Sequence, residues 1–435
     1  MEKAEILNVL NDWNFWKKDI DTGIRREELL KKLKALSKAK EVVVVKGIRR
    51  SGKSTLLLQF CKDLIESGVK KEDILIVNFE DPRLKNLDLD LLNKIYEIYL
   101  TELNPSEKHY IVLDEVQIVS GWEKFARFLH ESKKAGVFVT GSSSKMLSSE
   151  YSTVLAGRHL DLEVRPLSFR EYLGFAGVGA KTGIEISANR HKIKRAMAEY
   201  LRWGGFPKVS IVKNENEKRE LLETYFRDII IKDISLRYGV KQIEKLEELA
   251  KFYLTNISSM QSFNKIKNLL KLNLDTVERF SNYLASVYML SFVRKFSYSK
   301  KEQLLNPRKV YCSDTGMRNS VSFVFSEDAG RLAENIVFNE ISRRGLEIFY
   351  WKGDREADFV VKDGKKVSWA IQVCWNLNSM ETKEREIAGL LEACKALKLK
   401  SGIIVTEDFS GEEKIDGVKI FYRTLWEFLL AEEIS

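Results

Sequence analysis

The sequence predicts an α/β protein in which a parallel sheet forms around a phosphate-binding loop. Residues 41–190 alternate short apolar runs with helical segments, which is typical of parallel strands joined by helices. One run, Val42–Val45, leads into the glycine-rich segment 47–54 and then into an apolar helix. Residues 325–435 return to mixed α/β character and begin with a helix. We therefore expect an α/β part at each end and helical modules between them.

The first α/β part contains five candidate strands. Buried parallel strands are continuous apolar runs rich in branched residues, and five segments fit this description. They are Val42–Val45, Ile74–Phe79, Tyr110–Leu113, Val137–Thr140 and Leu160–Val164. Helical segments lie between them, so the sheet is predicted to be parallel.

The chain is too long for one typical core, and its boundaries are predicted where periodicity is weak. The two weakest stretches are Gly177–Ala188 and Val321–Glu327. The predicted parts are an N-terminal helical segment at 1–40, a phosphate-loop core at 41–190, a helical lid at 191–244, a helix-and-hairpin module at 245–320 and an α/β domain at 325–435.

The composition is that of a soluble globular protein: 44% of residues are hydrophobic and 31% are charged. No stretch approaches the length of a membrane span, and the charged N-terminus has no apolar signal core. The four cysteines are scattered, without a disulfide framework or a metal-ligand spacing. We therefore expect a cytoplasmic protein with no membrane partner. The net charge of +9 is moderate and hints at a polyanionic partner without establishing one.

Residues 47–54 form a complete G-x-x-x-x-G-K-S phosphate loop (Walker A). Gly47 and Gly52 let the backbone N–H groups point inward, and the helix N-terminus adds partial positive charge. Lys53 is expected to reach the β- and γ-phosphates, and the Ser54 hydroxyl to ligate Mg²⁺. The predicted nucleotide-binding residues are Gly47, Arg49, Arg50, Ser51, Gly52, Lys53, Ser54, Thr55 and Ser142.

The segment 110–115 is an apolar strand that ends in two carboxylates. Asp114 is predicted to hold Mg²⁺, directly or through water, and Glu115 to polarise the attacking water. An Asp-Glu pair is also an ordinary loop start, but the preceding phosphate loop favours the nucleotide interpretation. A nucleotide switch that hydrolyses slowly would not need Glu115.

Two further polar positions follow. The strand Val137–Thr140 runs into a serine-rich segment, and the strand beside the phosphate-loop strand often places a polar residue near the γ-phosphate. Ser142 is the first choice and Thr140 the second; the alternative is a serine-rich loop without nucleotide contact. Arg158 follows a glycine turn and is either an arginine finger, in cis or from a neighbouring subunit, or part of a structural ion pair. The catalytic candidates are therefore Lys53, Glu115 and Arg158.

The ordered motifs resemble a known family. Along the chain occur Gly-x-Arg-Arg-Ser-Gly-Lys-Ser, Asn-Phe-Glu-Asp-Pro, Leu-Asp-Glu-Val-Gln, Thr-Gly-Ser-Ser, Leu-x-Gly-Arg, Arg-Pro-Leu-Ser-Phe-x-Glu-Tyr, Lys232-Asp233-Ile234 and Lys309-Val310-Tyr311-x-x-Asp314-x-Gly316. Together they look like the archaeal and bacterial AAA-type predicted ATPases with a C-terminal domain of unknown function, over nearly the whole chain. The resemblance implies an AAA+ core, a winged-helix module, a restriction-endonuclease-like C-terminal domain and ATP as the nucleotide.

The module at 245–320 has the order helix, turn, helix, basic hairpin, which is typical of a winged helix. Its strands are predicted at 290–297 and 309–312, with a basic turn at 298–302. The candidate DNA contacts are Lys265, Lys267, Arg279, Lys300 and Lys301. The second helix, 277–290, carries few basic residues, so packing or protein contact is the alternative.

The C-terminal domain carries a departure from the nuclease pattern. Glu334 lies on a predicted helix, Asp358 near the start of a strand and Gln372 near the end of the next. In restriction-endonuclease-like sites two carboxylates bind Mg²⁺ and a lysine steadies charge at the scissile phosphate. Here Gln372 replaces the usual glutamate and Cys374 stands where the lysine would be.

Three interpretations of this domain stay open: a nuclease, a nucleic-acid-binding domain without cleavage, and a structural domain. Lys352, on a neighbouring strand, is a substitute lysine for the first. In the structural interpretation Asp358 pairs with Arg355 or Lys352, and Glu334 with Arg331. The two replacements argue against cleavage.

The sequence thus predicts an Mg²⁺-dependent ATPase that couples its nucleotide state to DNA or to a partner protein, as a monomer or an oligomer. The alternatives are a slow ATP-dependent switch and a nucleotide-regulated nuclease.

Overall fold

The computed structural model describes residues 1–143, 154–322, 329–377 and 380–434, and the chain divides into two compact units. Unit 1 comprises Met1–Arg165 with Ser286–Tyr288, and unit 2 comprises Pro166–Ala285 with Met289–Ser435. The first boundary lies before α7 (Phe169–Phe175), whereas the sequence placed the end of the core at 190. The reason is that α7 packs on other helices of unit 2 and contributes Phe169 and Leu173 to their core.

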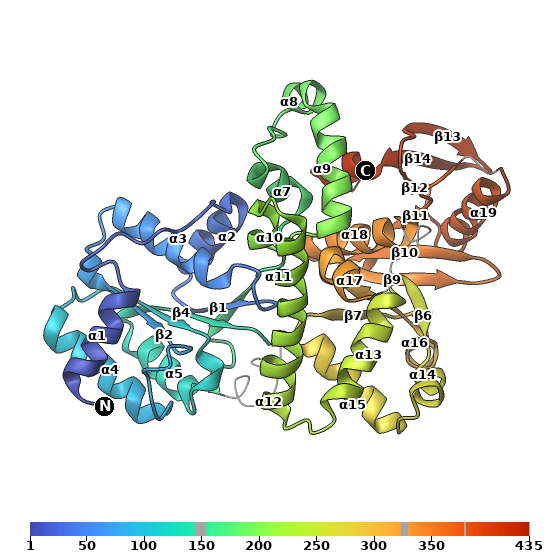
Figure 1. Cartoon of the computed structure of the whole chain (residues 1–435). Coiled ribbons are helices and arrows are strands. Elements are labelled where there is room, and N and C mark those ends of the chain that lie inside the picture. The colour runs from blue at the N-terminus through green and yellow to red at the C-terminus, as the bar shows by residue number, and fades with distance from the viewer. Residues whose placement is uncertain (144–153, 323–328, 378–379, 435) are drawn as a thin grey trace. The chain divides into compact units, whose positions relative to one another are not determined.

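Unit 1 is built on a five-stranded parallel sheet (Figure 1). The strands are β1 (Val42–Lys46), β2 (Ile74–Asn78), β3 (His109–Asp114), β4 (Ala135–Gly141) and β5 (His159–Glu163). Their order is β2-β3-β4-β1-β5, and every neighbouring pair is parallel. The five predicted strands are confirmed, with ends that shift by one or two residues.

Helices cover both faces of this sheet (Figure 1). Alternate residues of a strand point to opposite faces, and β1 shows the result. Val42 and Val44 belong to the core beneath α1 (Lys3–Trp13), α4 (Leu89–Leu103) and α5 (Trp122–Ser132), and Val43 and Val45 to the core beneath α2 (Glu27–Ser37) and α3 (Lys53–Glu66). Because all five strands are parallel, their carboxyl ends meet at one edge, where the loops after β1, β3 and β4 come together.

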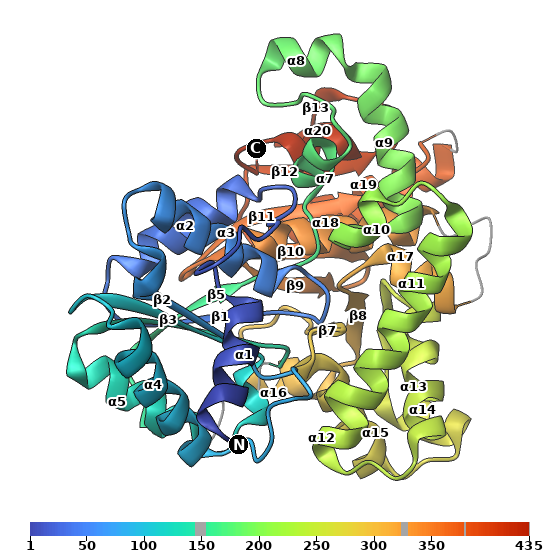
Figure 2. The ribbon, with the colours of Figure 1, turned by 60° about the vertical axis from the view of Figure 1, so that its left-hand side comes forward.

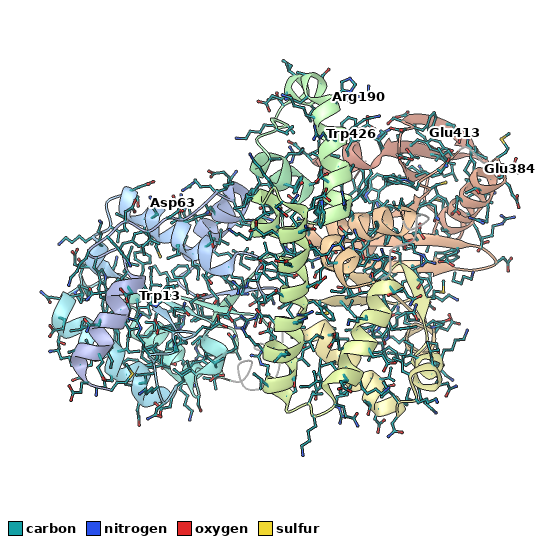
Figure 3. All side chains as sticks on the ribbon, in the orientation of Figure 1. Trp13, Asp63, Arg190, Glu384, Glu413 and Trp426 are labelled. Atoms are coloured by element: carbon teal, nitrogen blue, oxygen red, sulfur yellow. The ribbon has the colours of Figure 1, made fainter. Side chains whose placement is uncertain are left out.

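Side-chain contacts of Trp13 and Asp63, both labelled in Figure 3, fasten the N-terminal helices to the rest of unit 1. The indole Nε1 of Trp13, at the end of α1, donates to Asp81 Oδ2 after β2, at 2.9 Å. Asp63 on α3 accepts from Arg25 at 2.7 Å and contacts Lys34 on α2 at 2.7 Å. The predicted N-terminal helical segment therefore packs as part of unit 1.

Unit 2 begins with a helical region, which includes the segment 191–244 that was predicted to be helical. Its helices after α7 are α8 (Gly183–Ala188), α9 (Arg190–Trp203), α10 (Pro207–Ile211), α11 (Glu215–Asp228), a π-helical turn (Ile229–Ser235), α12 (Leu236–Tyr238) and α13 (Ile243–Thr255). α9 and α11 pack on α17 (Thr315–Val321). The guanidinium of Arg190 on α9 lies 5.9 Å from the ring of Trp426 near the C-terminus (Figure 3).

A three-stranded antiparallel sheet follows, and we call residues 259–312 the middle module. Its elements are β6 (Ser259–Gln261), α14 (Phe263–Leu270), α15 (Leu274–Ser286), β7 (Leu290–Val293), α16 (Lys300–Leu305) and β8 (Arg308–Cys312), and its strand order is β6-β8-β7. Helices α13, α14 and α15 lie near one another in both views (Figures 1 and 2).

Two predicted elements of the middle module differ in the structure. The strand predicted at 290–297 ends at Val293, because the next residues pair elsewhere: Phe296 N–H donates to Tyr350 O at 2.7 Å, and Tyr350 N–H to Arg294 O at 3.0 Å. The turn predicted at 298–302 contains the start of α16, which begins after its N-cap Ser299.

The C-terminal region is a six-stranded mixed sheet of order β13-β14-β12-β11-β10-β9. Its elements are α18 (Ala329–Arg343), β9 (Glu347–Lys352), β10 (Glu356–Asp363), β11 (Lys366–Val373), α19 (Met380–Ala396), β12 (Ser401–Thr406), β13 (Gly411–Ile415), β14 (Val418–Thr424) and α20 (Leu425–Leu430). One face packs on α18 and α20 through residues such as Phe359 and Ile403, and the other on α19 through residues such as Ala357 and Ile404. No helix in the described part of the chain has the length and apolar character needed to cross a bilayer.

Candidate nucleotide-binding site

The glycines of the phosphate loop are required by its backbone. Gly47 has a φ of 149°, and a Cβ at this position would lie 2.0 Å from the carbonyl oxygen of Val164. Gly52, the N-cap of α3, has a φ of 94°. Positive φ angles of this kind favour glycine, so both positions hold the loop in the shape predicted for phosphate binding.

Lys53 lies inside this loop. Its side chain is buried, and Nζ lies 3.2 Å from Gly47 O, 3.4 Å from Ile48 O and 3.5 Å from Glu115 Oε1. These distances exceed the 2.7–2.9 Å of a strong charge-assisted bond. The ammonium therefore lies in the loop without a tight partner among the described residues.

The Ser51 hydroxyl is a second polar group in the loop. Its oxygen is buried and has no hydrogen-bond partner among the described residues. A buried unsatisfied hydroxyl is costly unless a ligand completes it, so this atom fits the phosphate oxygens that the motif predicts.

The first Walker carboxylate joins the loop to two strands. Asp114 Oδ1 accepts from the Ser54 hydroxyl at 2.9 Å and from the Thr140 hydroxyl at 2.6 Å. Burial, and then the neighbouring Glu115, raise the pKa of the Asp114 carboxyl to about 6. The residues predicted to hold Mg²⁺, Ser54 and Asp114, are thus in direct contact although 60 positions separate them in the chain.

Glu115 adopts a left-handed backbone conformation with a φ of 53°, which is uncommon for a residue other than glycine. Its N–H donates to Thr140 Oγ1 at 2.7 Å, and its Oε2 accepts from the Gln117 amide. Burial works to raise the pKa of the Glu115 carboxyl, but Lys53 and Gln117 outweigh burial and hold that pKa below its ordinary value. The predicted base is therefore ionised at neutral pH.

Thr140 and Ser142, at the end of β4 and just after it, are the two residues predicted to lie near the γ-phosphate. Both are buried, and β4 lies between β3 and β1, so Ser142 stands at the edge where the loop begins. Thr140, the second choice, is the residue that contacts Asp114. Contact of Ser142 with a nucleotide stays a prediction.

Arginines also border the loop. Arg49 pairs with Glu80 after β2, at 2.8 Å. Arg26, which sequence reasoning missed, donates from Nη1 to Ser51 O at 2.9 Å and to Arg165 O at 3.0 Å. Arg26 therefore supports the backbone of the loop. The sequence around Arg26 does not predict this role, because the hydrogen-bond partners of Arg26 lie far along the chain.

Arg158 lies at the end of the sheet opposite the phosphate loop of its own chain. Arg158 precedes β5, whose first residue, His159, pairs with Val42 at the start of β1, whereas the phosphate loop follows Lys46 at the other end of β1. At a strand rise of about 3.3 Å per residue, the two ends of β1 lie about 13 Å apart. The Arg158 guanidinium is 4.0 Å from Glu131. Action on the site of a neighbouring subunit stays a prediction.

The nuclease-like residues gather around a lysine that sequence reasoning missed. Lys309 on β8 places Nζ 3.2 Å from Glu334 on α18 and 2.8 Å from Asp358 on β10. Lys352, the predicted substitute, contacts Glu356 at 3.5 Å instead. The signal for Lys309 was its place in the Lys309-Val310-Tyr311 motif, which the sequence did not connect with the carboxylates.

Gln372 turns its oxygen to the backbone. Its Oε1 accepts from Asp358 N–H at 2.9 Å, and its amide donates to Glu386 on α19. No group of three or more His, Cys, Asp or Glu side chains in the described ranges is arranged to hold a metal ion. The residues of this cluster therefore do not fit the Mg²⁺ of a nuclease.

The five candidate DNA contacts, Lys265, Lys267, Arg279, Lys300 and Lys301, are all exposed. They lie on α14, α15 and α16 of the middle module. Their exposure is compatible with a polyanionic partner and does not test for one.

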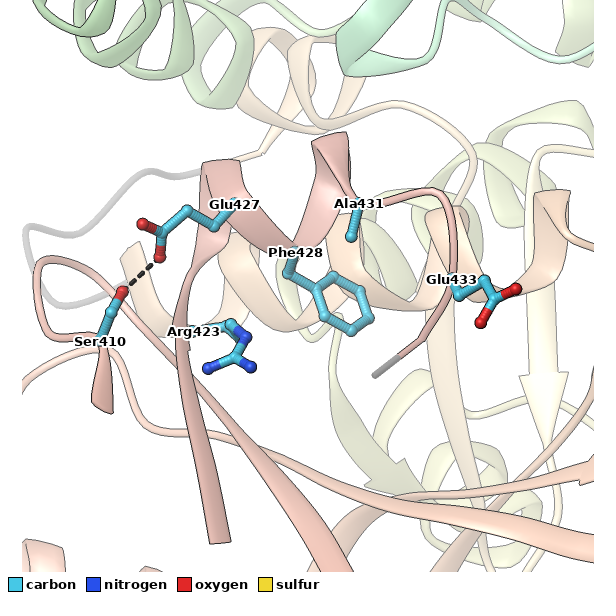
Figure 4. Close-up of a pocket in the computed structure, with 6 residues that line it drawn as sticks. All are labelled: Ser410, Arg423, Glu427, Phe428, Ala431 and Glu433. Atoms are coloured by element: carbon cyan, nitrogen blue, oxygen red, sulfur yellow. Dashed lines mark hydrogen bonds between the residues drawn. The ribbon is translucent and has the colours of Figure 1, made fainter. Parts of the chain in front are cut away.

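A pocket of about 270 Å³ lies near the C-terminus (Figure 4). Its walls come from β14, α20 and the segments beside them, and the Ser410 hydroxyl donates to Glu427 at its rim. Its lining residues are Ser410, Arg423, Glu427, Phe428, Ala431 and Glu433. None of the predicted site residues lines it.

Three family models match successive parts of the chain. Residues 39–173 match the AAA domain, residues 194–328 match a domain of unknown function, DUF8612, and residues 329–424 match another, DUF4143. The AAA match covers the sheet and the phosphate loop described above. The family models describe the C-terminal region only as a domain of unknown function, so its nuclease-like fold stays a prediction.

Two curated relatives span almost the whole chain. The uncharacterized protein MJ1544 of Methanocaldococcus jannaschii is 34% identical over 407 residues, which cover 89% of this chain and 88% of the relative. An uncharacterized protein of Haemophilus influenzae is 28% identical, over 93% of this chain and 98% of the relative. Among solved structures, the Walker-type ATPase PABY2304 of Pyrococcus abyssi aligns with a TM-score of 0.42 and 15% identity, over 70% of this chain and 99% of that one.

Proposed function

Since the chain belongs to the family of AAA-domain proteins that includes MJ1544 of Methanocaldococcus jannaschii, we propose that it binds ATP with Mg²⁺ and hydrolyses it. The observation that carries the proposal is the 2.9 Å contact between the Ser54 hydroxyl and the Asp114 carboxylate, beside the buried Lys53. Ser54 and Asp114 come from distant parts of the chain, and they meet at the carboxyl edge of the sheet, where α/β proteins bind ligands.

Each residue then has one task. The loop N–H groups and the Lys53 ammonium hold the phosphates, and Lys53 exchanges its long contact with Glu115 for a phosphate oxygen. Ser54 and Asp114 would hold Mg²⁺, which when bound offsets the charge of the phosphates. The Ser51 hydroxyl gains a partner in the loop.

Glu115 accepts the proton of the attacking water. Its lowered pKa keeps it ionised, and Thr140 fixes its backbone at 2.7 Å. A residue held in a strained conformation beside the phosphate loop suits a base that must be aimed. This feature favours hydrolysis over the slow-switch alternative.

We further propose that nucleotide state is coupled to DNA or to a partner protein through the middle module. The order strand, helix, helix, strand, short helix, strand and the sheet order β6-β8-β7 support a winged-helix arrangement. The exposed basic residues of α14, α15 and α16 supply positive charge for backbone phosphates.

ATP turnover with Mg²⁺ or EDTA, with and without single- and double-stranded DNA, tests both proposals. Lys53→Ala is expected to abolish turnover. Lys62→Ala removes a lysine of the same helix that pairs with Asp19 at 3.1 Å, and is expected to leave turnover unchanged. Turnover that survives Lys53→Ala or EDTA would refute the ATPase proposal. Turnover that is several-fold higher with DNA supports the DNA arm, and turnover indifferent to DNA leaves a protein as the partner.

A further inference from the structure

One lysine of the middle module lies at the centre of the acidic cluster in the C-terminal domain. Lys309 Nζ is 2.8 Å from Asp358 Oδ1, 3.0 Å from Glu356 Oε1 and 3.2 Å from Glu334 Oε1. The ammonium donates hydrogen bonds to Asp358 and Glu334, and its contact with Glu356 is an ion pair. Lys309 is only 2% exposed, and a charge so deeply buried persists only when it is paired.

The groups around this lysine close the cluster. The Tyr311 hydroxyl donates to Glu334 Oε1 at 2.7 Å, and the second oxygen of Asp358 accepts from Val373 N–H at 2.9 Å. Tyr311, Glu334 and Asp358 are themselves buried. Only Glu356, with a side chain 34% exposed, reaches toward solvent.

We propose that Lys309 is a built-in cation, which fills the position that a divalent metal would take among Glu334, Glu356 and Asp358. By filling it, Lys309 fastens strand β8 of the middle module to α18 and β10 of the C-terminal domain. While β8 is docked, the three carboxylates are closed to metal. The cluster is therefore a fastening between two parts of unit 2 and holds no nuclease metal.

The physical reason is competition for one position. A divalent ion such as Mg²⁺ binds carboxylate oxygens at about 2.0–2.1 Å. To do so here, it would have to occupy the volume of the ammonium group, whose positive charge repels it. Gln372, the remaining residue of the nuclease-like pattern, does not offer a metal ligand instead, because its side-chain oxygen already accepts a hydrogen bond from Asp358 N–H. The carboxylates become available to a metal only when Lys309 withdraws or is removed.

Removal of the lysine gives a direct test in the full-length chain. Thermal unfolding without nucleotide is measured in EDTA and in MnCl₂ for the wild type, Lys309→Ala and the double variant Lys309→Ala/Asp358→Asn. In EDTA, Lys309→Ala is expected to unfold about 6 °C lower, because buried carboxylates lose their cation. Mn²⁺ is expected to recover at least half of that loss in Lys309→Ala and none in the double variant, relative to any change in the wild type.

A Lys309→Ala variant that ignores Mn²⁺, or one as stable in EDTA as the wild type, overturns the proposal. If Lys309→Ala does not fold, Mn²⁺ binding to the wild type and to Glu356→Gln, read by electron paramagnetic resonance, decides the question. Glu356 is partly exposed, so its neutral variant is expected to fold. Equal Mn²⁺ binding by the two proteins supports a site that the lysine already fills, and weaker binding by Glu356→Gln refutes it.

Discussion

Lys53 and Lys309 are both buried beside carboxylates, and the protein holds them in opposite ways. Lys53, in the phosphate loop of unit 1, has contacts of 3.2 to 3.5 Å to two backbone carbonyls and one carboxylate. Lys309, in unit 2, has contacts of 2.8 to 3.2 Å to three carboxylates. Both combine a lysine with acidic side chains, but the first lysine keeps only long contacts, whereas the second donates to two carboxylates and forms an ion pair with a third.

The contacts of the two lysines differ although both lysines lie beside acidic side chains, so residue types alone do not define a site. Two glycines with positive φ angles shape the loop beside Lys53, and the Ser51 hydroxyl there has no partner among the described residues. Beside Lys309 the polar atoms are side chains already engaged with one another. The first arrangement suits an anionic ligand, and the second suits a permanent structural contact.

We expect the largest loss of ATP turnover from a substitution at the nucleotide site. Glu115→Gln removes the base while preserving shape, so turnover is expected to fall about 10³-fold with ATP binding retained. Single-turnover hydrolysis and equilibrium binding of a fluorescent ATP analogue measure the two quantities. Glu97→Gln, at an exposed glutamate on α4, serves as the matched control. Comparable turnover in Glu115→Gln and the wild type would exclude Glu115 as the base.

The second prediction addresses the other lysine. Lys309→Met keeps the length of the side chain but leaves buried carboxylates without a cation, so the free energy of unfolding is expected to fall by about 3–5 kcal/mol. Chemical denaturation measures it, and Lys395→Met, which breaks an exposed pair with Asp416, is expected to change it by less than about 1 kcal/mol. Equal effects of the two variants would mean that Lys309 is no more tightly held than a surface lysine.

A third prediction uses the pKa of about 6 that burial and Glu115 give to Asp114. Because this pKa is raised, the carboxyl binds a proton as the pH falls through 6, and the proton competes with Mg²⁺. The Mg²⁺ concentration for half-maximal turnover is expected to rise by up to about tenfold per pH unit below pH 6 and to be constant above pH 7. Titrations of Mg²⁺ from pH 5 to 8 measure it. A constant value across that range would show that Asp114 does not meet the ion.

The smallest expected effect concerns Arg158. Because Arg158 lies at the amino-terminal edge of the sheet, Arg158→Ala is expected to change turnover of a dilute, monomeric sample by less than about twofold, a shift within about 0.5 kcal/mol. Turnover and molar mass are followed together over a range of protein concentrations. A loss that grows as oligomers form would assign Arg158 to a neighbouring subunit's site, and a large loss in the monomer would contradict its placement.

Much of unit 1 was predictable because its signals are local. The apolar runs gave all five strands within two residues, and the phosphate loop was identified from eight consecutive positions. Asp114 and Glu115 were recognised from the strand before them. The role of Arg26 was not predicted, because Arg26 donates to Ser51 O and Arg165 O, and a local sequence pattern does not reveal contacts between residues far apart in the chain.

Two elements of the middle module differ from the sequence-based prediction. The strand predicted to reach residue 297 ends at Val293, because residues 294–296 pair with the segment around Tyr350, which local propensity cannot foresee. The basic turn contains helix α16, whose N-cap Ser299 was not recognised as a start signal.

The sequence by itself determined the α/β core and its phosphate loop, because strands and glycine loops are specified by neighbouring residues. It also shows that a negative charge of the nuclease pattern is missing at Gln372 and a positive charge at Cys374. The packing of the chain alone brings Lys309 beside Glu334 and Asp358 and puts Arg158 at the end of the sheet opposite the loop of its own chain. Ion pairs depend on distance through space, and in this chain that distance is set by how β8, α18 and β10 pack together.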